Sequence, residues 1–84
     1  MMDRIFCIGD RVKHFKHEGY PEDSKQYTYE IVAFAHHSET GENLVVYKSL
    51  YNDDVCARPT EMFMSEVDHE KYPLVTQKYR FEKM

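Results

Sequence analysis

The segment His37-Ser38-Glu39-Thr40 combines side chains that are common in catalysis: an imidazole, two hydroxyls and a carboxylate. A hydrolase triad needs its nucleophile within hydrogen-bond reach of its base, but neighbours in an extended segment point to opposite faces. Short polar side chains at turns usually bond to nearby backbone. We therefore predict that this segment fixes a turn and contributes no catalytic residue. A small enzyme with its site at 37–40 is the alternative.

A second set combines aromatic, cationic and imidazole side chains. Two phenols, a guanidinium and an imidazole can hold a planar or anionic group by stacking and bidentate hydrogen bonds. Tyr47 and Tyr51 share a face if both lie in one strand, and the next strand can bring Arg58 close to them. Alternatively, the rings are core and Arg58 pairs with Glu61 or Glu39. The predicted ligand-binding residues are His37, Ser38, Glu39, Thr40, Tyr47, Tyr51, Arg58 and Glu61.

A possible basic stripe lies near the two ends of the chain. Its residues are Arg11, Lys13, Lys16, Lys78 and Arg80. A nucleic-acid accessory module would use these cations on one shared face, and its binding would weaken steeply with salt. The formal net charge of −4 opposes non-specific nucleic-acid binding, and lysines commonly protect exposed edge strands. Nucleic acid is therefore a possible partner that the sequence does not favour.

Metal and phosphate-loop chemistry find little support in the residue spacing. The metal-ligand residue types are His14, His17, His36 and His37, with Glu39 or Asp54. A metal site needs three or four converging ligands, and no spacing in this chain enforces such convergence. Three isolated glycines form no glycine-rich loop. We predict no metal site and no cofactor.

The elements that position these residues are predicted from alternation and turn signals. The β-branched and aromatic segments on either side of Gly41 predict a hairpin that turns through 39–43, with a positive φ at Gly41. Pro59 favours a short helical turn that places Phe63 in the core. Both faces of 27–36 are largely apolar, which predicts a central strand buried on both sides at its middle. The predicted strands are 10–16, 27–36, 44–51, 55–58 and 64–68, and 72–81 is a closing strand or strap.

Length and composition predict one small domain over 1–84. A chain of 84 residues buries only roughly 60 to 65% of its unfolded surface, so its core is modest. Seven Tyr and five Phe suit a small SH3-like barrel of about five strands with one short helical or 3-10 turn. Residues 1–9 form a lead-in, and 17–26 form a long polar loop.

The cysteine pattern and the apolar segments predict the cellular setting. Cys7 and Cys56 lack paired spacing, which predicts neither a disulfide nor zinc but two buried or half-buried thiols in a reducing compartment. The apolar run 5–8 is too short for a signal peptide or a membrane helix. We expect a cytoplasmic protein without a membrane partner, and the oligomeric state stays open.

Several sequence blocks together resemble a small bacterial and phage family that is catalogued as a domain of unknown function, numbered 1653. The resemblance covers 12–81 and includes the blocks His14-Phe15-Lys16, Tyr29-Glu30-Ile31-Val32, His37-Ser38-Glu39-Thr40, Val46-Tyr47-Lys48-Ser49-Leu50-Tyr51, Arg58-Pro59-Thr60-Glu61-Met62-Phe63 and Arg80-Phe81. The chain departs from the family pattern in a longer 17–28 loop, in His36 where Arg is common, and in Cys56-Ala57 where a Trp-hydrophobic pair is common. The resemblance implies no established activity. We therefore expect a non-enzymatic binding or adaptor module that recognises a peptide, a partner protein or a nucleotide-like group.

Overall fold

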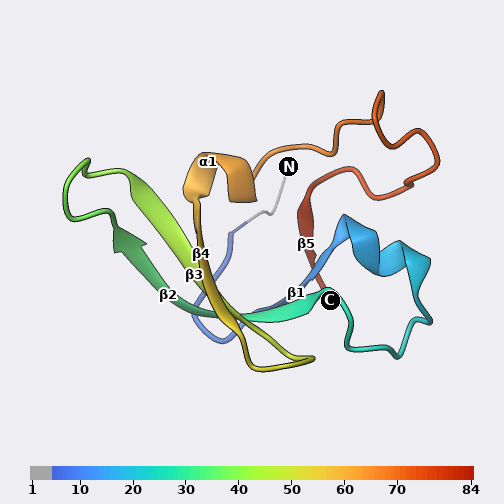
Figure 1. The fold of residues 1–84 in the computed structure, drawn as a ribbon, viewed down its shortest axis with the longest axis horizontal. Coiled ribbons are helices and arrows are strands. Elements are labelled where there is room, and N and C mark those ends of the chain that lie inside the picture. Colours follow the sequence, from blue (N-terminus) through green and yellow to red (C-terminus); the bar gives the residue numbers. More distant parts are fainter. Residues whose placement is uncertain (1–4) are drawn as a thin grey trace.

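The computed structural model describes residues 5–84 as one antiparallel sheet with two short helical turns (Figure 1). The five strands lie in the order β4-β3-β2-β1-β5. Their bounds are β1 (Arg11–His14), β2 (Thr28–His36), β3 (Asn43–Ser49), β4 (Val55–Pro59) and β5 (Phe81–Lys83). A 3-10 turn, η1 (Phe15–Gly19), follows β1, and a short helix, α1 (Thr60–Phe63), follows β4. The predicted mainly β class with a helical turn after Pro59 is confirmed.

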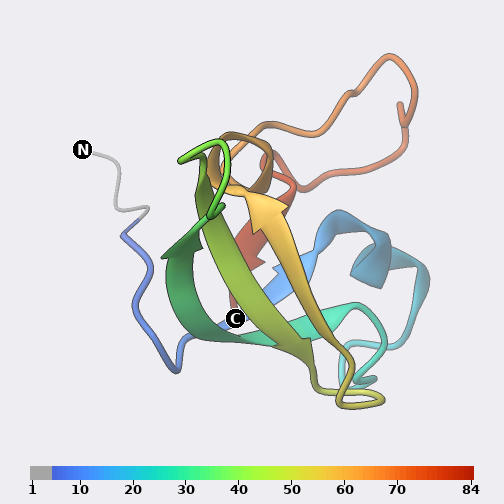
Figure 2. The same ribbon diagram turned by 60° about the vertical axis from the view of Figure 1, so that its left-hand side comes forward.

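The β2–β3 hairpin is the longest strand pairing of the sheet. Its turn closes through backbone hydrogen bonds from His37 N to Glu42 O at 2.8 Å and from Gly41 N to His37 O at 2.9 Å. Gly41 has a φ of 76°, which confirms its predicted role. The register shifts between Ile31 and Ala33, so β2 carries a bulge. A bulge bends its strand, and Figure 2 shows the sheet strongly curved.

The core lies on the concave face and takes side chains from four of the strands and from α1. Phe63 of α1 is completely buried, as predicted. Its ring stacks on that of Phe81 with centroids 4.3 Å apart and planes 8° apart. This stack therefore joins α1, which directly follows β4, to the edge strand β5. The buried core cluster is Val12, Ile31, Val45, Tyr47, Phe63 and Phe81.

The first strand is shorter than predicted. Val12 and His14 share the buried face, as expected, but the strand ends at His14 instead of Lys16. His14 Nδ1 accepts a hydrogen bond from Lys16 N at 3.1 Å, and this contact starts η1. Phe15 is buried within that turn. The predicted polar loop at 17–26 therefore begins inside a 3-10 turn.

The predicted strand at 64–68 is wrong. Residues 64–80, hereafter the 64–80 loop, contain one isolated bridge between Glu66 and Tyr79 and no extended strand. The backbone of this segment instead bonds within its own loop, because Val67 N donates to Lys78 O at 2.9 Å and Ser65 O accepts from Arg80 N at 2.8 Å. Val67 is nevertheless buried, with 5% of its surface exposed. The prediction thus took a single buried side chain, Val67, for part of a strand.

Two further expectations, a β2 strand buried on both sides and buried thiols, are wrong. Val32 and Phe34 are 41% and 49% exposed, so β2 is central but is not buried on both sides. Cys7 and Cys56 are both exposed and free, so the predicted burial of the thiols is wrong. Cys56 lies on β4, which is an edge strand of the described sheet. Within residues 5–84 the sheet is not closed into a barrel by strand pairing.

Candidate functional site

The hairpin segment 37–40 uses its polar groups on its own backbone. His37 Nδ1 accepts hydrogen bonds from the backbone N–H groups of Glu39 at 3.1 Å and Thr40 at 3.4 Å. Thr40 Oγ1 accepts one from Glu42 N at 3.2 Å. All of these residues are exposed. The imidazole and one hydroxyl thus cap the turn, which is a structural use of both groups.

Glu61 lies in a different environment from Arg58. A hollow of about 510 Å³ lies between the hairpin turn and α1. Its lining is Gly41, Glu42, Asn43, Pro59, Thr60, Glu61 and Met64, which includes two carboxylates and no cation. This hollow has nothing that would hold an anion, and Arg58 does not line it.

The two tyrosines of the predicted site are separated. Tyr47 is a core residue with 4% of its surface exposed, whereas Tyr51 is 59% exposed. The expectation that they share a strand face is wrong, because β3 ends at Ser49. Ser49 Oγ accepts a hydrogen bond from Tyr51 N at 3.1 Å, and the chain turns there toward β4.

Arg58 lies close to Tyr47, as predicted. The register pairs Arg58 with Val45, and this pairing places the arginine on the concave face. Its Nε donates a hydrogen bond to Tyr47 Oη at 3.1 Å. The guanidinium carbon lies 5.6 Å from the centroid of the Phe81 ring. Within the described residues Arg58 forms no ion pair with Glu39 or Glu61.

Arg58 also opens onto a small cavity that the sequence did not predict, hereafter the basic cavity. Its volume is about 290 Å³. Segments far apart in the chain build it, because η1 and the 64–80 loop lie on the same side of the sheet (Figures 1 and 2). Four cations and a single carboxylate line it. The full lining is His14, Phe15, Lys16, Arg58, Asp68, Lys71, Tyr72 and Arg80.

The two arginines are held by one nitrogen each. Arg80 Nε donates a hydrogen bond to Ser65 Oγ at 3.2 Å, as Arg58 Nε does to Tyr47 Oη. Within residues 5–84, the terminal nitrogens of both guanidinium groups lack a hydrogen-bond partner. In that range the one ion pair joins Lys83 and Asp10 at 3.4 Å. The hydrogen bond at Nε therefore orients each guanidinium group, and the two terminal nitrogens (the fork) remain available for bidentate hydrogen bonds.

Asp68 forms no ion pair with these cations among the described residues. Its Oδ1 accepts hydrogen bonds from Glu70 N at 3.1 Å and from Lys71 N at 3.3 Å. The carboxylate thus caps its own turn. The ammonium group of Lys71 lies 5.5 Å from the centroid of the Tyr72 ring, and that ring contacts Phe15 with centroids 4.9 Å apart. Lys71 and Tyr72 form the wall that the 64–80 loop contributes.

His14 is the neutral polar group of the basic cavity. It is 7% exposed, and burial lowers its pKa to about 4, with further lowering from the charges of Arg58, Arg80 and Lys16. The ring is therefore uncharged at neutral pH. Because Nδ1 accepts from Lys16 N, the proton resides on Nε2. The imidazole is thus a neutral donor among four cations.

The predicted basic stripe does not form one surface. Lys16 and Arg80 meet in the basic cavity, but the other three cations lie elsewhere. Arg11 is exposed on β1 opposite Glu30. Lys13 pairs with Glu82 across β1 and β5, and Lys78 lies over the Tyr79 ring at 5.4 Å. Tertiary structure thus combines two members of the stripe with Arg58 from the other predicted set.

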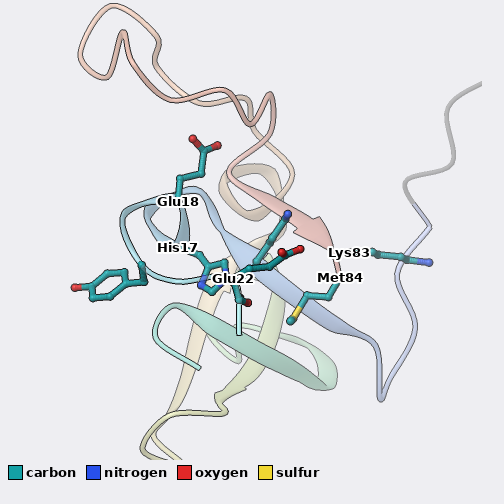
Figure 3. A pocket seen from close by; sticks show the side chains of 7 residues that line it. His17, Glu18, Glu22, Lys83 and Met84 are labelled. Carbon is teal, nitrogen blue, oxygen red and sulfur yellow. Dashed lines mark hydrogen bonds between the residues drawn. The ribbon is translucent and has the colours of Figure 1, made fainter. Parts of the chain in front are cut away.

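A larger hollow of about 580 Å³ lies beside β1, η1 and β5 (Figure 3). Its lining is Lys13, His17, Glu18, Tyr20, Glu22, Lys83 and Met84. The two lysines are balanced by two glutamates, and Lys83 is paired with Asp10. Figure 3 shows the Glu18 carboxylate turned away from the His17 ring, and this carboxylate accepts hydrogen bonds from Thr76 and Gln77. The charges here are already matched within the protein.

Sequence reasoning missed Lys71, Tyr72 and Asp68, and it assigned no ligand-binding role to His14 or Phe15. One signal was available, because the H-F-K, R-P and R-F blocks that carry the family resemblance meet at the basic cavity. No group of three metal-ligating side chains occurs among residues 5–84. Within the same range, no helix is long and apolar enough to cross a membrane.

Comparisons with known proteins give one match. A family model described as "Protein of unknown function (DUF1653)" matches residues 10–83, nearly the whole chain. No curated protein and no solved structure matches the chain. The match includes every residue that lines the basic cavity.

Proposed function

The chain belongs to the DUF1653 family, and we propose that it is a small non-enzymatic binding module whose basic cavity holds an anionic group of a partner molecule. One observation carries this proposal: Lys16, Arg58, Lys71 and Arg80 converge on one cavity without ion-pair partners among the described residues. This function is a more specific form of the expected recognition of a nucleotide-like group.

Electrostatics support an anion as the occupant. Like charges close together repel one another, and the charges of Arg58, Arg80 and Lys16 add to burial, the larger cause, in lowering the pKa of His14. Groups with strongly perturbed pKa values concentrate at functional sites. A bound anion would relieve the repulsion and would accept hydrogen bonds from both guanidinium forks.

The lining favours binding over catalysis. No serine, threonine or cysteine lines the basic cavity, so it offers no aliphatic hydroxyl or thiol as a nucleophile. His14 already uses Nδ1 on the backbone of Lys16, which leaves a donor and no free base. A set of cationic donors without a serine, threonine or cysteine suits recognition.

The finer fold assignment belongs to the same proposal. We infer an SH3-like barrel, because the order β5-β1-β2-β3-β4 with a helical turn between β4 and β5 is typical of that fold. The stack of Phe63 on Phe81 supports closure, since it links the edge strand β5 to α1, the helix that directly follows the other edge strand. In this arrangement the basic cavity lies where η1 and the 64–80 loop meet beside β1.

An amide-resolved NMR titration of the whole chain with inorganic phosphate and with sulfate tests the proposed function. We expect shifts at Lys16, Arg58, Lys71 and Arg80, and at least a tenfold loss of affinity in Arg58→Gln and in Arg80→Gln. Arg11→Gln is the matched control, because it removes an exposed cation outside the cavity. Absence of shifts at the cavity, or equal losses in the control, would contradict the proposal.

A nucleic-acid accessory module is the second candidate. It gains support from Lys16 and Arg80, which were predicted for that role and line the same cavity. The separation of the other three cations weighs against it. The slope of log affinity against log salt separates the two functions, because a polynucleotide releases many counterions and a small anion releases few.

A further inference from the structure

Resting on the proposed function, we propose that the basic cavity recognises the terminal phosphate of a small phosphate monoester, in preference to a carboxylate or a bridging phosphodiester. Four features of the basic cavity support this preference: its charge, the directions of its donors, its size and its acidic surroundings.

The charge balance favours a dianion. Four cations and one carboxylate give the lining a formal charge of +3, with His14 neutral. A phosphate monoester carries about −1.5 to −2 charges at pH 7 and has three terminal oxygens. A carboxylate or a phosphodiester carries only one negative charge. The monoester therefore matches the cavity more closely than either alternative.

The donors approach from several directions. Arg58 comes from β4 and Arg80 directly precedes β5, so the two guanidinium groups come from opposite edges of the sheet. Lys16 comes from η1 and Lys71 from the 64–80 loop. Donors spread in this way suit a tetrahedral group, whereas a planar carboxylate presents only two oxygens on one side. The anchored Nε atoms of both arginines fix these directions in advance.

The size of the cavity favours a terminal group. Its volume of about 290 Å³ is at the lower end of the roughly 300 to 1,000 Å³ that small-molecule pockets occupy. Phe15, which is 4% exposed, and His14, which is 7% exposed, form its buried side. A bridging phosphodiester must continue in two directions, but a monoester continues in one. A closed side therefore favours the monoester.

The surroundings favour a small ligand over a polynucleotide. The part of the 64–80 loop that supplies Lys71 also carries Glu66, Asp68 and Glu70, all of them exposed. The whole chain has a formal net charge of −4. A polynucleotide would bring its neighbouring phosphates against these carboxylates, whereas a single phosphate group needs only the cavity.

Calorimetric and NMR titrations of the whole chain with matched ligands test this inference. The pair 5′-AMP and 3′,5′-cyclic AMP shares one nucleoside and differs in monoester against diester phosphate. We expect 5′-AMP and inorganic phosphate to bind at least tenfold more tightly than cyclic AMP and acetate, with shifts at the cavity residues. A 5′-phosphorylated oligonucleotide completes the set, and we expect it to bind no more tightly than 5′-AMP.

The outcomes separate this inference from the proposed function. If all anions bind equally at the cavity, the module still binds anions but the preference for a monoester is wrong. If the oligonucleotide binds tenfold more tightly than 5′-AMP, the small-ligand part is wrong. If no anion shifts the cavity residues, both proposals are wrong.

Two variants test the site directly. Arg58→Lys keeps the charge but loses the fork, so we expect a five- to tenfold loss of affinity for inorganic phosphate. Lys71→Gln lies in an exposed loop and leaves the core untouched, so it tests the site even if Arg58→Lys impairs folding. We expect a three- to tenfold loss in Lys71→Gln, and unchanged affinity in this variant would overturn the assigned site.

Discussion

The hairpin turn and the basic cavity both gather polar side chains, but they use them differently. At the turn, His37 and Thr40 accept three hydrogen bonds from backbone N–H groups within five residues of sequence. At the cavity, Arg58 and Arg80 each donate one hydrogen bond to a protein partner through Nε, and their terminal nitrogens stay available. The polar groups of the turn bond to one another, whereas the cavity has more hydrogen-bond donors than protein acceptors.

The difference shows how a polar cluster can be judged. A cluster that is contiguous in sequence easily serves its own backbone, because short side chains reach only neighbouring groups. A cluster assembled from distant segments brings like charges together against their repulsion, and local geometry does not explain it. The excess of donors over protein acceptors, more than the catalytic types of the residues, identifies the candidate site.

The largest expected effect concerns His14, whose pKa is lowered mainly by burial and further by the cations of the basic cavity. Its pKa is about 4 in the folded protein and ordinarily 6.5, so below pH 6.5 the unfolded chain binds a proton that the folded chain does not. The free energy of unfolding should therefore fall between pH 6.5 and 4, by up to about 3 kcal/mol, at about 1.4 kcal/mol per pKa unit. Urea denaturation across this range measures the loss.

His14→Asn is the matched variant, because an amide oxygen can replace Nδ1 as the acceptor for Lys16 N without titrating. Its stability should be nearly flat between pH 6.5 and 4.5. Sulfate should also flatten the wild-type curve, since a bound anion offsets the cations that face His14 from β4, η1 and the segment before β5. The same slope in wild type and variant would remove His14 as the cause.

Part of the fold could be predicted because its signals are local. Gly41 marks the hairpin through a positive φ, and Pro59 marks the start of the helical turn that buries Phe63. The end of β1 could not be predicted, since it depends on one bond from Lys16 N to the His14 ring. Likewise, residues 65–67 bond to residues 78–80 of the same loop, and no local sequence pattern encodes that contact.

The same distinction holds for the candidate site. The proximity of Arg58 and Tyr47 follows from the pairing of β3 with β4, which the turn signals imply. The positions of Lys71 and Tyr72 do not follow from any local pattern. Glu18 fixes their loop by accepting hydrogen bonds from residues 58 and 59 positions later in the chain. A contact at that separation leaves no spacing signal in one sequence.

The next effect concerns the contact between Glu18 and the 64–80 loop. It tests whether the basic cavity needs the wall that this loop contributes. Glu18 accepts hydrogen bonds from Thr76 N at 3.0 Å, Thr76 Oγ1 at 3.1 Å and Gln77 N at 2.6 Å. Glu18→Ala should lower the free energy of unfolding by about 1.5 kcal/mol, since hydrogen bonds to charged groups contribute about that much. Phosphate affinity should fall three- to fivefold as Lys71 and Tyr72 lose their fixed position.

Asp23→Ala is the control for Glu18, because it removes an exposed carboxylate from the neighbouring loop. The hydrogen bonds lower the pKa of Glu18 below its ordinary 4.5, so its contribution is complete above pH 4.5 and is lost as the pH falls through the folded pKa. This window lies below most of the His14 window. Unchanged phosphate binding in Glu18→Ala would make the loop wall dispensable.

A smaller effect tests whether the anchoring of Arg58 matters. Tyr47→Phe removes the hydroxyl that accepts from Arg58 Nε and keeps the ring in the core. We expect a loss of about 1 kcal/mol in the free energy of unfolding and about a threefold loss of phosphate affinity. Tyr51→Phe, at an exposed position, should change neither. Equal phosphate affinity in all three proteins would show that the Arg58 fork needs no anchor.

The smallest effect is expected at the hairpin turn. It tests whether the turn, and not the basic cavity, is the binding site. His37→Ala removes the acceptor for two backbone N–H groups, but the turn is exposed and water can replace the ring. The free energy of unfolding should therefore fall by only about 0.5 to 1 kcal/mol, and phosphate affinity should stay the same. His36→Ala, one position earlier and equally exposed, is the control for chemical denaturation and for titration. If His37→Ala abolished ligand binding while the fold stayed intact, the hairpin would be the site, and the free donors of the basic cavity would need another explanation.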